Sequence, residues 1–271
     1  MSRTQRKGGN TSPIKHYLQF SGSTGTFSYY DKAAKERVDL EQIEIIVLDV
    51  RASVTGYNST SKAQITSNMV ADISSEKLKV TSWKDKKSTN IAEGLYKNIK
   101  NEVTSKSVGG KFTTNVICLC DVTGEGQEVC NLQLTGSALN SWIKFIDTLE
   151  KGGEYDNVIT LKQGALSVVD GKVFRAVTPK EEKDLDAKLK KNPRAPRPIW
   201  FYVVDFETVE LSEDEADLAI EQDSILQAYF EGATATKAET SEDEDGEDVE
   251  DEKEQSAPDD AEGEDKEKLP F

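Results

Sequence analysis

Short runs in which apolar and polar residues alternate recur between residues 27 and 211 of the chain. The clearest runs cover residues 43–50, 78–83, 111–120, 129–134, 158–161, 166–169, 173–177 and 199–211. Such alternation is typical of strands with one buried face. Asp170 and Gly171 stand between two of these runs, and both residues tolerate positive φ, which predicts a tight hairpin. The body of the chain is therefore predicted to be rich in strands.

Three segments have helical spacing instead. Apolar residues repeat every four positions over residues 91–103. Asn90 and Glu93 occupy capping-box-like positions at the start of this segment. A second stripe covers residues 139–149 and includes Trp142, which its spacing assigns to the core. Ser212 and Glu215 form a capping box before a third stripe, which is expected to end at Gly232 and whose polar face is acidic. The first two helices are expected to cover part of a sheet.

A strand-rich body with one or two packed helices fits a small barrel of the oligonucleotide/oligosaccharide-binding (OB) type, and a β-sandwich fits nearly as well. We expect a mainly β fold, a decorated OB barrel, over residues 14–211. A flexible basic arm over residues 1–13 precedes it, and an acidic amphipathic helix over residues 212–231 follows it. Residues 232–271 contain few apolar side chains and are expected to form a disordered acidic tail.

Charge is divided unevenly along the chain. The 271 residues together carry a net charge of −16. Residues 212–271 contain 24 acidic and 4 basic side chains, which leaves residues 1–211 with 30 basic and 26 acidic side chains and a net charge of +4. Opposite signs in the two parts indicate an acidic interaction tail on a mildly basic body. The acidic pI of the whole chain therefore does not argue against a nucleic-acid ligand of the body.

Several other chemistries are poorly supported by the sequence. It contains no Gly-rich phosphate loop and no serine nucleophile elbow, and its one histidine, His16, lies beside the basic arm. Cys118 and Cys120 share one face of a strand and are predicted to be buried hydrophobes, which disfavours a zinc site. We expect no enzyme activity and no cofactor. With no signal peptide and no bilayer-spanning run, a cytoplasmic protein without membrane contact is expected.

Single-stranded nucleic acid is held where aromatic side chains and cations share an open surface. In residues 77–83, alternation places Leu78 and Val80 on one strand face and Lys77, Lys79 and Trp83 on the other. Three more lysines follow at once: Lys84, Lys86 and Lys87. The segment is predicted to bind nucleic acid, and a tryptophan packed at the strand end beside a solvated lysine turn is the alternative.

A second basic run precedes the strand at residues 199–211. It combines cations with an aromatic residue in a Pro-punctuated loop: Lys188, Lys190, Lys191, Arg194, Arg197 and Trp200. Such a loop could hold phosphates while Trp200 stacks a base, or it could be a solvated linker before a buried strand. A third group consists of Tyr29, Arg51, Tyr57 and Lys62, and its tyrosines could equally be half-buried core residues.

The end of the chain has a separate pattern, in which Leu269, Pro270 and Phe271 follow the acidic run. A terminal aromatic residue on a flexible stalk is a suitable ligand for a pocket with a basic rim. This order of basic strand-rich body, acidic tail and terminal Pro-Phe resembles single-stranded DNA-binding proteins, including bacteriophage ones. Bacterial members end in acidic residues and Ile-Pro-Phe, whereas here Lys266 and Lys268 interrupt the acid and Leu269 replaces the isoleucine.

The resemblance implies single-stranded DNA binding without strong sequence preference during DNA replication, recombination or repair. It also implies that residues 269–271 recruit a replication protein such as a polymerase, helicase or primase, in the host cytoplasm if a phage encodes the chain. The sequence leaves open whether the chain forms a homodimer. The alternatives are an acidic chaperone or DNA-mimic protein that binds basic partners through the tail, and an enzyme or processivity factor with an incidental tail.

Overall fold

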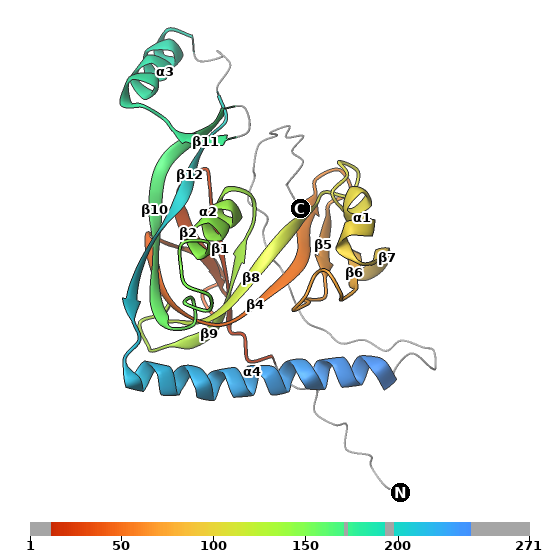
Figure 1. Ribbon diagram of the computed structural model, residues 1–271. Coiled ribbons are helices and arrows are strands. Elements are labelled where there is room, and N and C mark those ends of the chain that lie inside the picture. Colours follow the sequence, from red (N-terminus) through yellow and green to blue (C-terminus); the bar gives the residue numbers. More distant parts are fainter. Residues whose placement is uncertain (1–11, 171–172, 193–197, 240–271) are drawn as a thin grey trace, which may run out of the picture.

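The computed structural model describes residues 12–170, 173–192 and 198–239, and the described part is mainly β (Figure 1). Its strands form one mixed sheet. They are β1 (His16–Ser21), β2 (Thr26–Asp31), β3 (Glu36–Leu40), β4 (Gln42–Asn58), β5 (Ala63–Ser67), β6 (Leu78–Lys84), β7 (Lys87–Gly94), β8 (Gly110–Cys120), β9 (Glu128–Leu134), β10 (Asn157–Asp170), β11 (Val173–Ala176) and β12 (Trp200–Glu210). The helices are α1 (Tyr96–Val103), α2 (Gly136–Ile146), α3 (Pro179–Lys191) and α4 (Glu213–Glu239).

The sheet is open rather than closed into a barrel. Its main path runs in the order β3-β2-β1-β9-β8-β4-β5-β6-β7, and β10 leaves this path beside β4. The 17-residue strand β4 explains the fork, because one of its edges pairs first with β10 and later with β5. The mainly β prediction is thus confirmed, whereas the structure does not confirm an OB barrel.

A β-bulge in β4 changes which residues of the strand face each side of the sheet. Val47 pairs with Cys118 and Asp49 with Ile117, so Leu48 is an extra residue between them. Such an insertion reverses the alternation of side chains along the strand. Val47 and Val50 therefore face the same side despite their odd spacing, and both contribute to one core cluster. We call this side the inner face and the opposite side the outer face.

The two faces are covered by different helices. On the inner face α2 packs on the cluster around Leu18, Cys118 and Leu132, and its Trp142 is buried as predicted. Cys118 and Cys120 are likewise buried on this face, which confirms their predicted role, and burial raises the pKa of the Cys120 thiol to about 12. Farther along the inner face, α1 packs Ile99 and Val103 on the last strands of the path.

Helix α4 covers the outer face and starts where the sequence predicts. The Ser212 hydroxyl and the Glu215 carboxylate form the reciprocal capping hydrogen bonds. Leu226 is fully buried against a cluster that includes Ile46 and Ile117. The helix continues to Glu239, so the expected end at Gly232 is wrong, because one glycine costs a helix only about 1 kcal/mol. None of the described helices has a stretch long and apolar enough to span a membrane.

Two other helix expectations differ from the structure. Residues 91–94 belong to β7 rather than to a helix, and α1 begins only at Tyr96. The reason is a tight turn at Asp85 and Lys86, both with positive φ, which folds β7 back onto β6. Helix α3 was not expected, and its residues include none that is buried.

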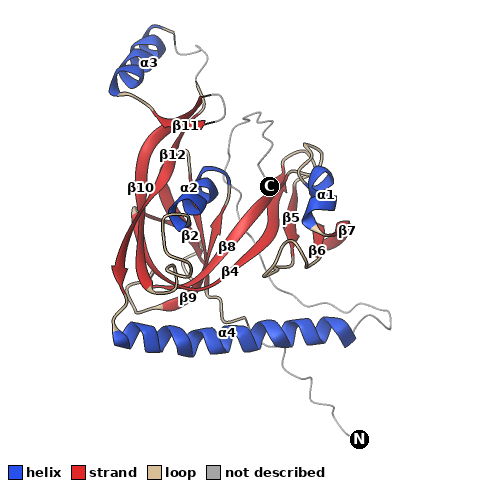
Figure 2. Ribbon diagram, viewed as in Figure 1, coloured by secondary structure: helices blue, strands red, loops and turns tan. Residues whose placement is uncertain are grey.

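The ends of β10 and β12 that lie beyond the pairing with β4 extend away from the rest of the sheet as a ribbon, which we call the β10–β12 arm. A hairpin at this place is confirmed, since β10 pairs with β11, but Asp170, predicted to lie in the turn, is paired with Val173 at the end of the strand, and residues 171–172 lie outside the described ranges. Figure 2 shows α3 at the far end of the β10–β12 arm, on the opposite side of the molecule from β5, β6 and β7. The β10–β12 arm and these strands are therefore separate surfaces.

Candidate nucleic-acid interface

Two exposed aromatic rings lie in one row on the outer face of strands β4 to β7. Tyr57 pairs with Gln64, Gln64 with Trp83, and Trp83 with Ser88. Directly paired residues point to the same face of a sheet, so all four side chains are on one side. Tyr57 is 47% exposed and Trp83 46% exposed. The row thus presents two ring faces with a glutamine amide between them.

The neighbouring row on the same face is polar and basic. Lys111 pairs with Thr55, Thr55 with Thr66, and Thr66 with Thr81, which places a lysine at one end of a threonine ladder. Lys79 lies two residues before Thr81, and alternation gives it the same face. Together the two rows form a surface that we call the aromatic face, defined by Thr55, Tyr57, Gln64, Thr66, Lys79, Thr81, Trp83 and Lys111.

The predicted alternation in β6 is confirmed. Leu78 and Val80 are fully buried under α1, whereas Lys79 and Trp83 are exposed on the other side. Lys77 is exposed just before the strand, and its carbonyl accepts a hydrogen bond from the Asn68 side chain.

The remaining lysines of this group lie at the tip of the β6–β7 hairpin. Lys84 pairs with Lys87, and alternation from Trp83 places both on the inner side of the hairpin. Lys86 occupies the turn between them. The structure therefore brings Lys79 and Trp83 onto one face but leaves Lys84, Lys86 and Lys87 at its rim.

The aromatic face carries two lysines and, beside Lys79, the carboxylate of its cross-strand partner Glu93. Lys79 and Lys111 are exposed, and neither side chain forms an ion pair within the described ranges. The same holds for Lys62, which lies in the turn from β4 to β5 with φ of 55°. A flexible lysine that forms no ion pair can turn toward a phosphate at little cost.

Arg51 lies on the outer face of β4 but is already engaged by α4. Its Nε donates to Asp49 Oδ2 at 2.7 Å, and its Nη2 donates to Gln227 Oε1 at 3.3 Å. The guanidinium also stacks over the Phe230 ring, 3.6 Å from its centroid. In this arrangement Arg51 fastens α4 to the sheet, and a phosphate would have to compete with all three partners.

Tyr29 does not belong to any open surface, so its prediction as a binding residue is wrong. Its ring is 6% exposed in the core between β2 and the loop after β8, and its hydroxyl donates to the Val122 carbonyl at 3.3 Å. The edge of the His16 ring contacts it. Tyr29 alternates with Phe27, which is fully buried on the same face of β2.

The second basic run lies on the β10–β12 arm. Lys188, Lys190 and Lys191 are exposed in the last turn of α3, rather than in a loop, while Arg194 and Arg197 lie outside the described residues. Helix α3, which carries the three lysines, is separated from strands β5, β6 and β7 of the aromatic face (Figure 1).

Trp200 also lies on the β10–β12 arm, and it is half-buried. It lines a shallow hollow of about 370 Å³ together with Val168, Leu185 and Lys188. The hollow combines an aromatic ring with the cation of Lys188 and with the carboxylates of Glu181 and Asp184. The tip residues Leu269, Pro270 and Phe271 lie outside the described ranges.

Sequence reasoning missed Gln64, Thr66 and Lys111 as parts of the aromatic face. Lys111 begins an alternating run, so its exposure could have been read from the sequence, but its neighbours depend on strand register. Among the described residues, no group of three or more metal-binding side chains is placed to hold an ion. Comparison of the chain with protein-family models, with curated protein sequences and with solved structures finds no match.

Proposed function

We propose that the chain binds single-stranded DNA on the aromatic face. The observation that carries the proposal is the row Tyr57–Gln64–Trp83, in which two exposed rings share a sheet face with two exposed lysines. Bases stack on such rings regardless of sequence, because every base has a π-face, and lysines track the phosphates. An open face serves this purpose as well as an OB barrel would, since the contacts need rings and cations on one surface.

The C-terminal part of the chain would then regulate DNA binding and recruit partner proteins. The acidic segment after α4 competes with DNA for the lysines, because its carboxylates resemble a phosphate backbone in charge. Residues 269–271 recruit a replication protein such as a polymerase, helicase or primase through their apolar side chains and terminal carboxylate. The protein would act in DNA replication, recombination or repair. No step in this proposal makes or breaks a covalent bond.

The charge of the tail favours a second candidate, an acidic chaperone or DNA-mimic protein. Residues 212–271 carry a net charge of −20 and could bind basic proteins directly. This candidate predicts no affinity of the body for DNA. It therefore differs from the first candidate in what happens when the tail is removed.

The test is titration of a labelled oligonucleotide with the full chain and with a variant that ends at Glu239. The first candidate predicts tighter binding by the shortened variant and a fall of log K with log salt, at about −0.7 per phosphate contacted. Lys79→Gln and Lys111→Gln should each reduce that slope, while Lys97→Gln on α1 should not. No measurable affinity of the shortened variant at low salt would reject single-stranded DNA binding.

A further inference from the structure

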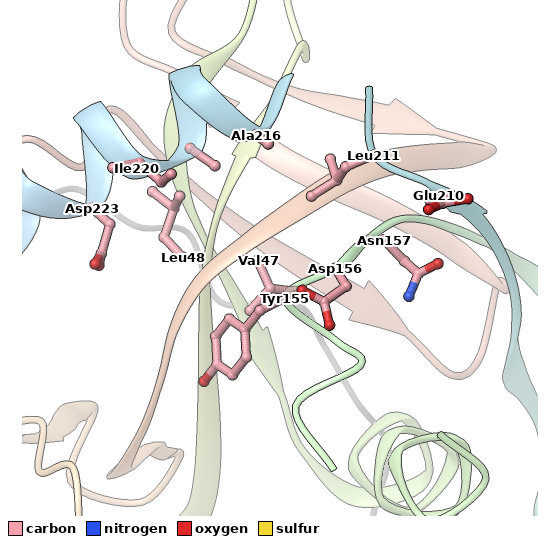
Figure 3. A pocket seen from close by; sticks show the side chains of 11 residues that line it. Val47, Leu48, Tyr155, Asp156, Asn157, Glu210, Leu211, Ala216, Ile220 and Asp223 are labelled. Carbon is pink, nitrogen blue, oxygen red and sulfur yellow. The ribbon is translucent and has the colours of Figure 1, made fainter. Parts of the chain in front are cut away.

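A second concave surface lies on the outer face, beside the N-terminal half of α4. The first half of α4, the bulge of β4 and the segment before β10 enclose a groove of about 770 Å³ (Figure 3). Its walls are apolar, with Leu48 from β4, Leu211 from the connection to α4, and Ala219 and Ile220 from α4 itself. Tyr155 forms the opposite wall.

This groove collects exposed apolar side chains. Ile220, which is 66% exposed, and Tyr155, 41% exposed, line the groove, and Val209, 65% exposed, lies next to the lining residue Glu210 without lining it; these are three of the eight large apolar residues exposed in the described ranges. Val209 pairs with Val158, whose side chain packs in the outer-face cluster, so Val209 points to the same side as the groove. Concentrated exposure of this kind marks an interaction surface, whereas scattered single residues do not.

The rim of the groove is acidic. Asp156, Glu210 and Asp223 line it, and within the described ranges none of these carboxylates forms an ion pair. Asp223 accepts one hydrogen bond, from Gln227 Nε2 at 2.9 Å. Burial and the nearby carboxylates of Glu154, Asp49 and Asp223 raise the pKa of Tyr155. None of the described residues that line the groove is a lysine or arginine, so the field of these residues repels phosphates and attracts cations.

A free strand edge lies beside the groove. Strand β12 pairs with β10 along one edge, and on its other edge the Tyr202 and Val204 N–H groups donate to Gly22 O and Ser141 Oγ. The N–H groups of Thr208 and Glu210 point the same way by alternation and donate to no backbone or side-chain acceptor in the described part of the chain. An extended segment could pair along this edge and continue past Glu210 and Leu211 into the groove.

We propose that this groove docks a partner protein through an extended, positively charged segment that carries an apolar anchor residue. The anchor would lie against Ile220 and Leu48, and flanking lysines or arginines would meet Asp156 and Asp223. Apolar contact gives affinity, and the carboxylate rim selects the charge of the partner. This site is separate from the aromatic face and does not depend on DNA binding.

The test pans a phage-displayed library of random 12-residue peptides on the full chain, with counter-selection on the Ile220→Ser variant. Counter-selection removes peptides that bind only the acidic tail, because the variant keeps that tail. Ile220 is exposed, so the substitution should leave the fold intact, which circular dichroism and the unfolding midpoint verify. Matched controls are Ile225→Ser and Asp217→Asn, at exposed positions of α4 that do not line the groove.

We expect enriched peptides in which lysine or arginine flanks an apolar residue. Their affinity should fall by about tenfold in Ile220→Ser and in Asp156→Asn/Asp223→Asn, and should be unchanged in both controls. The proposal is overturned if no sequences are enriched, if the peptides bind all variants equally, or if they are not cationic. Sedimentation that shows self-association lost in Ile220→Ser would also overturn it, because the occupant would be a second copy. Oligonucleotide affinity of the same variants should be unchanged.

Discussion

Replacing Trp83 by alanine removes one of the two rings on which the proposed DNA-binding surface depends. Base stacking on an aromatic side chain contributes about 1–3 kcal/mol per base. The loss of one stack should therefore weaken oligonucleotide binding by about 5- to 150-fold. Trp83 is 46% exposed at the end of β6, so the ring has a free face for stacking and the substitution should leave the sheet intact.

Replacing Tyr57 by alanine tests the same prediction independently. Tyr57 is separated from Trp83 by one strand, and neighbouring strands are about 4.8 Å apart, so the two positions are about 10 Å apart. Both side chains project side by side from the same face of the sheet, so each ring presents its own surface for stacking. Each ring should then hold its own base, and the losses in Tyr57→Ala/Trp83→Ala should add to within about 0.5 kcal/mol.

The assay is fluorescence anisotropy of a labelled oligonucleotide at low salt, with each variant checked by circular dichroism. Tyr155→Ala is the matched control. Tyr155 is 41% exposed, as the two rings are, but it lies among carboxylates in the groove beside α4. This variant should bind the oligonucleotide as the unmodified chain does. If Trp83→Ala and Tyr57→Ala, correctly folded, also bind with unchanged affinity, stacking on this face is refuted.

Three further results follow from the fold. Leu226→Ala should lower the free energy of unfolding by about 2–5 kcal/mol in urea titrations, because the residue is fully buried beneath α4, and a change below about 1 kcal/mol would contradict the packing described. Hydrogen bonds from Arg175 and Thr178 lower the pKa of Glu181 to about 2, so its contribution to α3 should be complete above about pH 4.5 and lost as the pH falls through 2. An NMR titration of Glu181 should show this midpoint, and it should rise in Arg175→Ala. Cys120, whose pKa burial raises to about 12, should not react with a thiol reagent at pH 8 until the protein unfolds.

Local patterns predicted faces well and element boundaries less well. Leu78, Val80 and Trp83 take the sides that alternation assigns, because a strand with one buried face has few other choices. The four-residue repeat over residues 91–103 combined the end of β7 with α1, and the repeat could not reveal the turn that separates them. Helix α3 has only Leu185 and Leu189 as an apolar stripe, too short a signal to be noticed.

The candidate site required information that no local pattern contains. Lys79 and Trp83 were expected to share a surface, but the row that joins Tyr57 to Trp83 depends on the registers of three strands. Arg51 was expected to be a binding residue, and its engagement by Phe230 and Gln227 depends on where α4 crosses the sheet. Long-range pairing is set by the packing of the whole core, so these neighbours emerge only from the structure.

The single extra residue at Leu48 also has an evolutionary meaning. Deleting it would put β4 into regular alternation, so that Val54 and Tyr57 would exchange sides unless the remaining chain slipped to compensate. No single substitution could cause an equally large change, because a substitution alters one side chain and a deletion inverts a whole strand. Insertion and deletion near residue 48 would therefore be the mutational steps by which an aromatic face of this kind is gained or lost in related chains.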